Sequence, residues 1–225
     1  MTTALQARCQ ALGERAVLLD FPGAPASLEL QQRLWRLREQ LLAAGDVVDC
    51  VPGMGNLSWV FDPEHLDGAG ACARLLQLWQ DQLDTAVPPA QSGRRVEIPV
   101  HYGGEAGPDL AGLARHHGLS PREVVRLHSG AEYRVFFLGF LPGFAYLDGL
   151  PAALHTPRLA TPRTVVPAGS VGIGGAQTGV YPCASPGGWQ LIGRTSLPLF
   201  DADAHPPTLL QPGDRLRFVV ERCDD

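Results

Sequence analysis

Four polar side chains stand out within a long run of glycines and prolines in the second half of the sequence: Arg163, Gln177, Tyr181 and Arg194. Glycine lets the backbone approach a ligand closely, and proline stiffens loops. A planar guanidinium holds a carboxylate or phosphate through two charge-assisted hydrogen bonds. We therefore expect Arg163 or Arg194 to bind such a group. Gln177 and Tyr181 are expected to orient an amide.

The same pattern has a structural explanation. A tightly turned β-barrel needs glycine at its corners, and either arginine can bond the carbonyls of neighbouring loops. Tight turns do not, however, require the glutamine, tyrosine, tryptophan and arginine side chains that recur beside these glycines. We therefore favour binding of a small polar substrate and leave a structural role open for each arginine.

Further candidates lie where this region begins. Residues 138–147 read LGFLPGFAYL, and four of them are expected to contribute to substrate binding: Phe140, Pro142, Gly143 and Phe144. His128 is the candidate catalytic residue, because we expect it at the end of a helix just before the strand that leads into this stretch. A surface or capping histidine is the alternative.

Familiar catalytic and cofactor motifs are missing from the sequence. Residues 172–177 read GIGGAQ, so Gln177 replaces the third glycine of a dinucleotide-binding loop, and no long helix is expected after it. The sequence contains no G-x-S-x-G elbow of a serine hydrolase. Its histidines form no H-E-x-x-H pair, and no metal site is predicted.

All 18 basic residues are arginine. The absence of lysine excludes a Walker P-loop lysine, a Schiff base with pyridoxal phosphate, a lysine nucleophile and covalent biotin on this chain. Any biotin chemistry would need a separate carrier protein.

Composition indicates an ordinary globular protein with a reducing, cytoplasmic location. The net charge of −5 does not favour a nucleic-acid partner. The five cysteines are scattered without a C-x-x-C pair, which predicts neither a disulfide framework nor a zinc site. No apolar stretch reaches the roughly 18 residues of a membrane helix, so no membrane association is expected.

The spacing of apolar residues predicts a small α+β domain over residues 1–86. Apolar positions recur at helical spacing from Ser27 to Ala44, where Gly45 follows as a cap. A second helix carries Leu75, Leu76, Trp79 and Leu83. Strands are expected over Arg15–Phe21, Val47–Val51 and Leu57–Phe61. Residues 87–95, rich in proline, glycine and serine, are predicted to be a linker.

Residues 96–225 are predicted to form a mainly-β domain. A strand over Val96–Tyr102 is followed by a short helix from Asp109. Ser120-Pro-Arg-Glu123 is a capping box that opens another helix, which is expected to end near His128. After a strand over Glu132–Phe140, short strands separated by glycine and proline continue to a last strand over Arg215–Glu221. This pattern is typical of a compact β-barrel or sandwich.

Four segments give the sequence a resemblance to a known family. They are GFLPGFAYL at 139–147, PRTVVPAGSV at 162–171, QTGVYP at 177–182 and SPGGWQLIGRT at 185–195. They resemble the carboxyltransferase subdomain C and D family, also called allophanate hydrolase subunit 1. The family includes the B subunit of prokaryotic 5-oxoprolinase and the Kip-type histidine kinase inhibitor.

The resemblance implies a cyclophilin-like β-barrel after the linker and a small α+β domain before it. It implies a non-autonomous component of an ATP-dependent 5-oxoprolinase that opens 5-oxoproline to glutamate. In that case companion 5-oxoprolinase subunits of the A type and the C type would be its partners, and the assembled complex would use ATP. Two alternatives remain open. One is the carboxyltransferase component of a biotin-dependent urea carboxylase or allophanate hydrolase system, and the other is a regulatory protein that inhibits a histidine kinase.

Overall fold

The computed structural model describes residues 6–45, 47–83 and 93–224. The chain divides into two compact units, residues 1–91 and 92–225, and each unit is described by itself. Most of the predicted linker, 87–95, lies outside the described residues. Within those ranges no helix is both long and apolar enough to cross a membrane.

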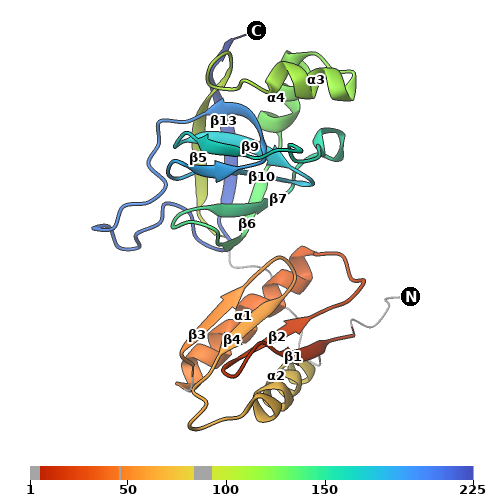
Figure 1. The fold of residues 1–225 in the computed structure, drawn as a ribbon, viewed down its shortest axis with the longest axis vertical. Coiled ribbons are helices and arrows are strands. Elements are labelled where there is room, and N and C mark those ends of the chain that lie inside the picture. Colours follow the sequence, from red (N-terminus) through yellow and green to blue (C-terminus); the bar gives the residue numbers. More distant parts are fainter. Residues whose placement is uncertain (1–5, 46, 84–92, 225) are drawn as a thin grey trace. The chain divides into compact units, whose positions relative to one another are not determined.

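The first unit is an antiparallel sheet with two helices on one of its faces (Figure 1). The order of strands in the sheet is β1-β2-β4-β3. In chain order the elements are β1 (Arg8–Ala11), β2 (Ala16–Asp20), α1 (Leu28–Ala44), β3 (Asp49–Pro52), β4 (Leu57–Val60) and α2 (Gly68–Leu83). The sequence pattern did not predict β1, whose side chains are mostly exposed and therefore show no apolar alternation.

Helix α1 begins and ends where its sequence predicts. The Ser27 hydroxyl accepts a hydrogen bond from the Leu30 amide, and Gly45 ends the helix in the left-handed conformation at φ 81°. Its leucines pack with those of α2 against the buried side chains of β2 and β4. These side chains include Val17, Leu19, Leu57 and Trp59.

The second unit is a closed barrel with the strand order β10-β7-β6-β13-β5-β12-β9. Its elements are β5 (Arg95–Gly103), α3 (Leu110–His117), α4 (Pro121–Gly130), β6 (Tyr133–Leu138), β7 (Ala145–Asp148), a 3₁₀ turn (Ala152–Leu154), β8 (Arg163–Val166), β9 (Ser170–Gly174), β10 (Gln177–Val180), β11 (Ser185–Gly187), β12 (Gln190–Arg194) and β13 (Arg215–Asp224). Strands β8 and β11 form a separate two-stranded ribbon. Figure 1 shows α3 and α4 together near one end of the barrel.

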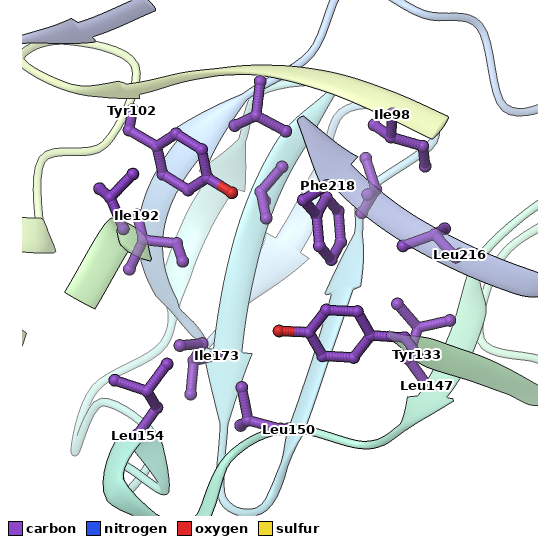
Figure 2. Packing of buried hydrophobic residues seen from close by; sticks show 14 of the residues in the cluster. Ile98, Tyr102, Tyr133, Leu147, Leu150, Leu154, Ile173, Ile192, Leu216 and Phe218 are labelled. Carbon is purple, nitrogen blue, oxygen red and sulfur yellow. The ribbon is translucent and has the colours of Figure 1, made fainter. Parts of the chain in front are cut away.

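The interior of the barrel is filled by aliphatic and aromatic side chains (Figure 2). Tyr102 and Tyr133 point their hydroxyls into this interior, and both meet His128 of α4. The Tyr102 hydroxyl hydrogen-bonds the His128 ring, and the Tyr133 hydroxyl donates to the His128 carbonyl. The capping box opens α4 as predicted. The predicted fold class, an α+β domain followed by a mainly-β barrel, is confirmed.

Candidate functional site

A cavity of about 330 Å³ opens on the second unit, and its walls come from four stretches of chain. They are the loop between β6 and β7 with the start of β7, the loop before β8, the residue that follows β10, and β11 with the turn that follows it. The lining residues are Phe140, Phe144, Tyr146, Arg158, Leu159, Pro162, Tyr181, Pro186, Gly187, Gly188 and Trp189. A volume of this size lies within the range of small-molecule sites.

Aromatic rings make up most of the wall. Phe144, Tyr181 and Trp189 are buried and belong to a small cluster separate from the barrel core. Phe144 meets Tyr181 and Trp189 edge to face, with ring centroids 5.4 and 5.5 Å apart. Tyr146 joins them with its ring centroid 5.0 Å from that of Phe144. Interlocked rings of this kind form a rigid apolar surface suited to a flat ligand.

Phe140 stands at the rim of the cavity in a strained backbone conformation. Among the described residues, Phe140 is the one non-glycine residue with a positive φ, at 68°. The residue is 59% exposed. The left-handed conformation costs an L-residue roughly 1–2 kcal/mol. The turn that follows needs glycine, because Gly143 has φ +84° and a Cβ there would lie 2.8 Å from the Leu199 carbonyl oxygen. Strain of this kind is often retained at ligand sites.

Tyr146 and Tyr181 are the lining residues that carry a hydroxyl group. Burial raises the pKa of Tyr181, while a backbone hydrogen bond from Trp189 and the charges of Arg158 and Arg163 act in the opposite direction. Burial also raises the pKa of Tyr146, again opposed by the charge of Arg158. Both phenols are therefore neutral at neutral pH and can donate a hydrogen bond to a ligand oxygen.

A glycine makes room for the Tyr181 hydroxyl. A Cβ at Gly187 would lie 2.5 Å from that oxygen. Any other residue at this position would push Tyr181 away from β11. The glycine-rich segment 185–188 thus sets the position of a lining side chain.

Arg163 and Arg194 both contact neighbouring loops and do not line the cavity. The Arg163 side chain donates to Oδ1 of Asp109 over 2.7 Å and to the Trp189 carbonyl over 3.4 Å. Arg194 donates from Nε to the carbonyl of Ala168 over 2.8 Å. The role in binding an acidic group, expected for one of them, stays a prediction.

His128 and Gln177 also lie outside the cavity wall. His128 is fully buried, and its two ring nitrogens bond the hydroxyls of Tyr102 and Thr178 over 2.8 and 2.9 Å. Burial lowers its pKa to about 3, so the ring is neutral. Gln177 is half-buried at the start of β10, opposite Gly174. In this conformation the His128 ring does not reach a ligand in the cavity, and its catalytic role stays a prediction.

The structure brings three of the predicted site residues, Phe140, Phe144 and Tyr181, onto one cavity wall. Pro142 and Gly143 shape the adjacent turn. Sequence reasoning passed over several lining residues, notably Tyr146, Arg158 and Trp189. Tyr146 and Trp189 stand inside the segments that carry the family resemblance, and Arg158 lies in a Thr-Pro-Arg triplet repeated at 161–163. These two signals were available in the sequence.

The described residues contain no group of three or more His, Cys, Asp or Glu side chains placed to hold a metal ion.

Comparison with known proteins supports the family resemblance. The model of the family described as carboxyltransferase domain, subdomain C and D, matches residues 7–210. The chain is 53% identical to the 5-oxoprolinase B subunit of Escherichia coli O157:H7 over 218 residues, covering 96% of this chain and 97% of that protein. It is 51% identical to the protein of the same name from Haemophilus influenzae over 210 residues, covering 93% and 96%. A weaker match, 36% over 132 residues, covers 50% of this chain and 7% of the urea amidolyase of Saccharomyces cerevisiae.

Solved structures agree with this assignment. The crystal structure of TTHA0988 superimposes with a TM-score of 0.76 at 40% identity, covering 94% of this chain and 40% of that one. The Kluyveromyces lactis urea amidolyase superimposes with a TM-score of 0.79 at 20% identity, covering 96% of this chain and 15% of that one, and shows the same fold. The resemblance inferred from the four sequence segments is confirmed: this chain belongs to the family of carboxyltransferase domains, subdomain C and D.

Proposed function

We propose that this chain is the B subunit of a multi-subunit, ATP-dependent 5-oxoprolinase, which opens 5-oxoproline to glutamate. The observation that carries the proposal is the likeness, at 53% identity and along 97% of its length, to a protein named as the B subunit of 5-oxoprolinase. Similarity that spans the whole of a relative supports the same role more strongly than similarity to a small part of a large enzyme.

The cavity provides features that suit this substrate. A five-membered lactam is a flat ring with an amide edge, and the rings of Phe144 and Trp189 offer it apolar walls. The neutral hydroxyls of Tyr146 and Tyr181 can hydrogen-bond the lactam oxygen. Phe140 lies at the rim of the cavity, and Pro142 and Gly143 form the turn beside it. Arg163, Gln177 and Arg194 would support the surrounding loops or contact a larger ligand.

The cavity lacks the groups needed for the whole reaction. Its lining residues include no carboxylate, histidine, cysteine or serine side chain, so a general base and a nucleophile are missing from this wall. In the reaction that we envisage, the amide oxygen of the ring takes the terminal phosphoryl group of ATP and ADP leaves. One water then adds to the activated carbon, and the ring C–N bond breaks to give γ-glutamyl phosphate. A second water hydrolyses this acyl phosphate to glutamate and phosphate. Companion proteins of the A type and the C type would supply the remaining catalytic groups.

The urea amidolyase similarity favours a second candidate, a carboxyltransferase component that acts on a ureido or urea group with biotin held on a carrier protein. The biotin ureido ring and the 5-oxoproline ring are both flat, five-membered and amide-edged. The cavity can therefore accept either in principle. A direct assay separates the two, and inhibition of a histidine kinase by the chain would indicate the third function considered above.

The first prediction is that the purified chain alone forms no glutamate from 5-oxoproline and ATP, whereas mixing it with its companion proteins produces 5-oxoproline-dependent ATP hydrolysis. ATP hydrolysis and glutamate are measured with 5-oxoproline, with urea plus a biotinylated carrier, and with neither. Turnover with urea and the biotinylated carrier, but not with 5-oxoproline, would favour the second candidate. Glutamate formation by the isolated chain would show that the companion proteins are not needed for catalysis.

A further inference from the structure

We propose that Arg158 is the anion anchor of the cavity and that the cavity selects small flat rings carrying a carboxylate. The inference deepens the proposed function and rests on it, because it treats this cavity as the place where the complex takes up its substrate. It names a specificity-determining side chain and the chemical class of ligand that this side chain recognises.

Arg158 differs from the arginines expected to bind an acidic group. Arg163 is paired with Asp109, and Arg194 is bonded to a loop carbonyl. Arg158 lines the cavity, and within the described part of the chain no hydrogen bond or ion pair involves its side chain. Its planar fork of donors is therefore available to a ligand.

The electrostatic surroundings of Arg158 favour an anion. The cavity lining contains no aspartate or glutamate, so the guanidinium charge is not neutralised there. Its charge acts on the hydroxyls of both Tyr146 and Tyr181. A carboxylate beside Arg158 could take two hydrogen bonds from the guanidinium and one from a phenol.

The aromatic part of the lining favours a flat apolar body. Phe140, Phe144 and Trp189 line the cavity, and Phe144 meets the rings of the other two edge to face, which restricts their relative orientation. A flat ring held among these side chains could offer a carboxylate substituent to Arg158, which lines the same cavity. An uncharged ring would keep the stacking and lose the ionic contact.

The test uses isothermal titration calorimetry on the full chain with 5-oxoproline and with its uncharged analogue 2-pyrrolidone. We expect Arg158→Gln to weaken 5-oxoproline binding at least tenfold, about 1.4 kcal/mol, and to leave 2-pyrrolidone binding unchanged. Arg158→Lys should recover part of the loss, because it restores the charge without the bidentate geometry. Arg115→Gln, which removes an exposed arginine of α3 outside the cavity, is the matched control and should bind like wild type.

Steady-state kinetics of the reconstituted complex provide the second measurement. Loss of a contact made equally in the ground and transition states raises KM and leaves kcat unchanged, and this is the result expected for Arg158→Gln. An unchanged affinity and KM for 5-oxoproline would overturn the inference. An equal loss of affinity for both rings would overturn it as well, since it would indicate a collapsed cavity.

The experiment separates this inference from the proposed function. If the wild-type complex fails to turn over 5-oxoproline but the chain still prefers ring carboxylates through Arg158, the proposed function fails and the inference stands. If the complex turns over 5-oxoproline with no contribution from Arg158, the function stands and the inference fails. If the wild-type chain binds 5-oxoproline no more tightly than 2-pyrrolidone, the inference is wrong.

Discussion

His128 illustrates how an ionisable side chain can be held neutral inside a barrel. The Thr178 hydroxyl donates to the Gly172 carbonyl, so it accepts from Nε2 of His128. Nδ1 is then free to accept from the Tyr102 hydroxyl. The ring also stacks on Phe218, with centroids 4.4 Å apart. A neutral imidazole satisfies every polar atom of this arrangement, and a proton would bring a charge into an apolar interior.

The second prediction is that the barrel loses stability in mild acid through His128. Its pKa in the folded chain, about 3, lies below the ordinary value of 6.5. Between these values the unfolded chain binds a proton and the folded chain does not, so the free energy of unfolding falls as the pH falls. From pH 7 to pH 5 the loss attributable to this group is about 2 kcal/mol. Urea unfolding followed by circular dichroism at both pH values measures it.

Variants isolate the contribution of this histidine. His128→Gln is expected to be less stable at pH 7 but to show a smaller decrease in stability from pH 7 to pH 5, because glutamine does not titrate. His116→Gln, at an exposed position on α3, should retain the wild-type decrease. If His128→Gln kept the full wild-type decrease, other groups would account for the acid sensitivity and the argument from burial would fail.

At the scale of elements, Asp109 connects α3 to two strands that support the cavity. Its carboxylate accepts from Arg163 at the start of β8 over 2.7 Å and from the Leu191 amide of β12 over 2.6 Å. The Asp109 amide in turn donates to the Leu191 carbonyl. Asp109 precedes α3, but its side chain does not cap the helix. The role of the carboxylate is therefore to join β8 and β12 to the start of α3. Trp189 of the cavity wall lies two residues before Leu191.

The third prediction is that Asp109→Ala destabilises the barrel by about 1–3 kcal/mol, since it leaves the Arg163 guanidinium and the Leu191 amide without their acceptor. Ligand binding should weaken as well, because the segment that carries Trp189 loses its attachment. Thermal unfolding and calorimetric titration are the measurements. Asp20→Ala, which removes the surface pair of Asp20 with Arg8, is the control and should cause a smaller change. Equal effects of the two variants would contradict the role given to Asp109.

At the scale of the whole molecule, the two units have separate hydrophobic cores. One core gathers leucines of α1 and α2 with the sheet of the first unit, and the other fills the barrel. All residues that line the cavity belong to the second unit. Units with their own cores can fold alone.

The fourth prediction follows from this separation. A fragment of residues 92–225 should fold cooperatively and bind 5-oxoproline with the affinity of the full chain, because its core and its cavity are complete. Circular dichroism, thermal unfolding and calorimetric titration test it. A fragment that is unfolded, or one that is folded but fails to bind, would show that the first unit contributes to the barrel or to the site.

Sequence alone determined those features that depend on neighbours along the chain. Leucines at helical spacing and the residues that cap α1 and α4 predicted these helices, because hydrogen bonds and side-chain contacts in a helix join residues three or four apart. The glycine-rich segments identified the family and pointed to Phe140, Phe144 and Tyr181. Arg158 and Arg163 stand in identical Thr-Pro-Arg triplets, and of the two arginines only Arg158 lines the cavity.

Tertiary structure decided those features that depend on residues far apart in the sequence. Barrel closure requires β13 to pair in parallel with β5, and no local pattern distinguishes that arrangement from a sandwich. The strand predicted to reach Phe140 ends at Leu138, because the loop holds Phe140 in a left-handed conformation. Similar arginines acquired different roles, since Arg163 meets Asp109, 54 positions away, while Arg158 is left facing a cavity. Burial of His128 also depends on residues distant in the sequence, such as Tyr102 and Thr178. The neighbours that determine whether a side chain is charged, and what it can contact, are brought together only when the chain folds.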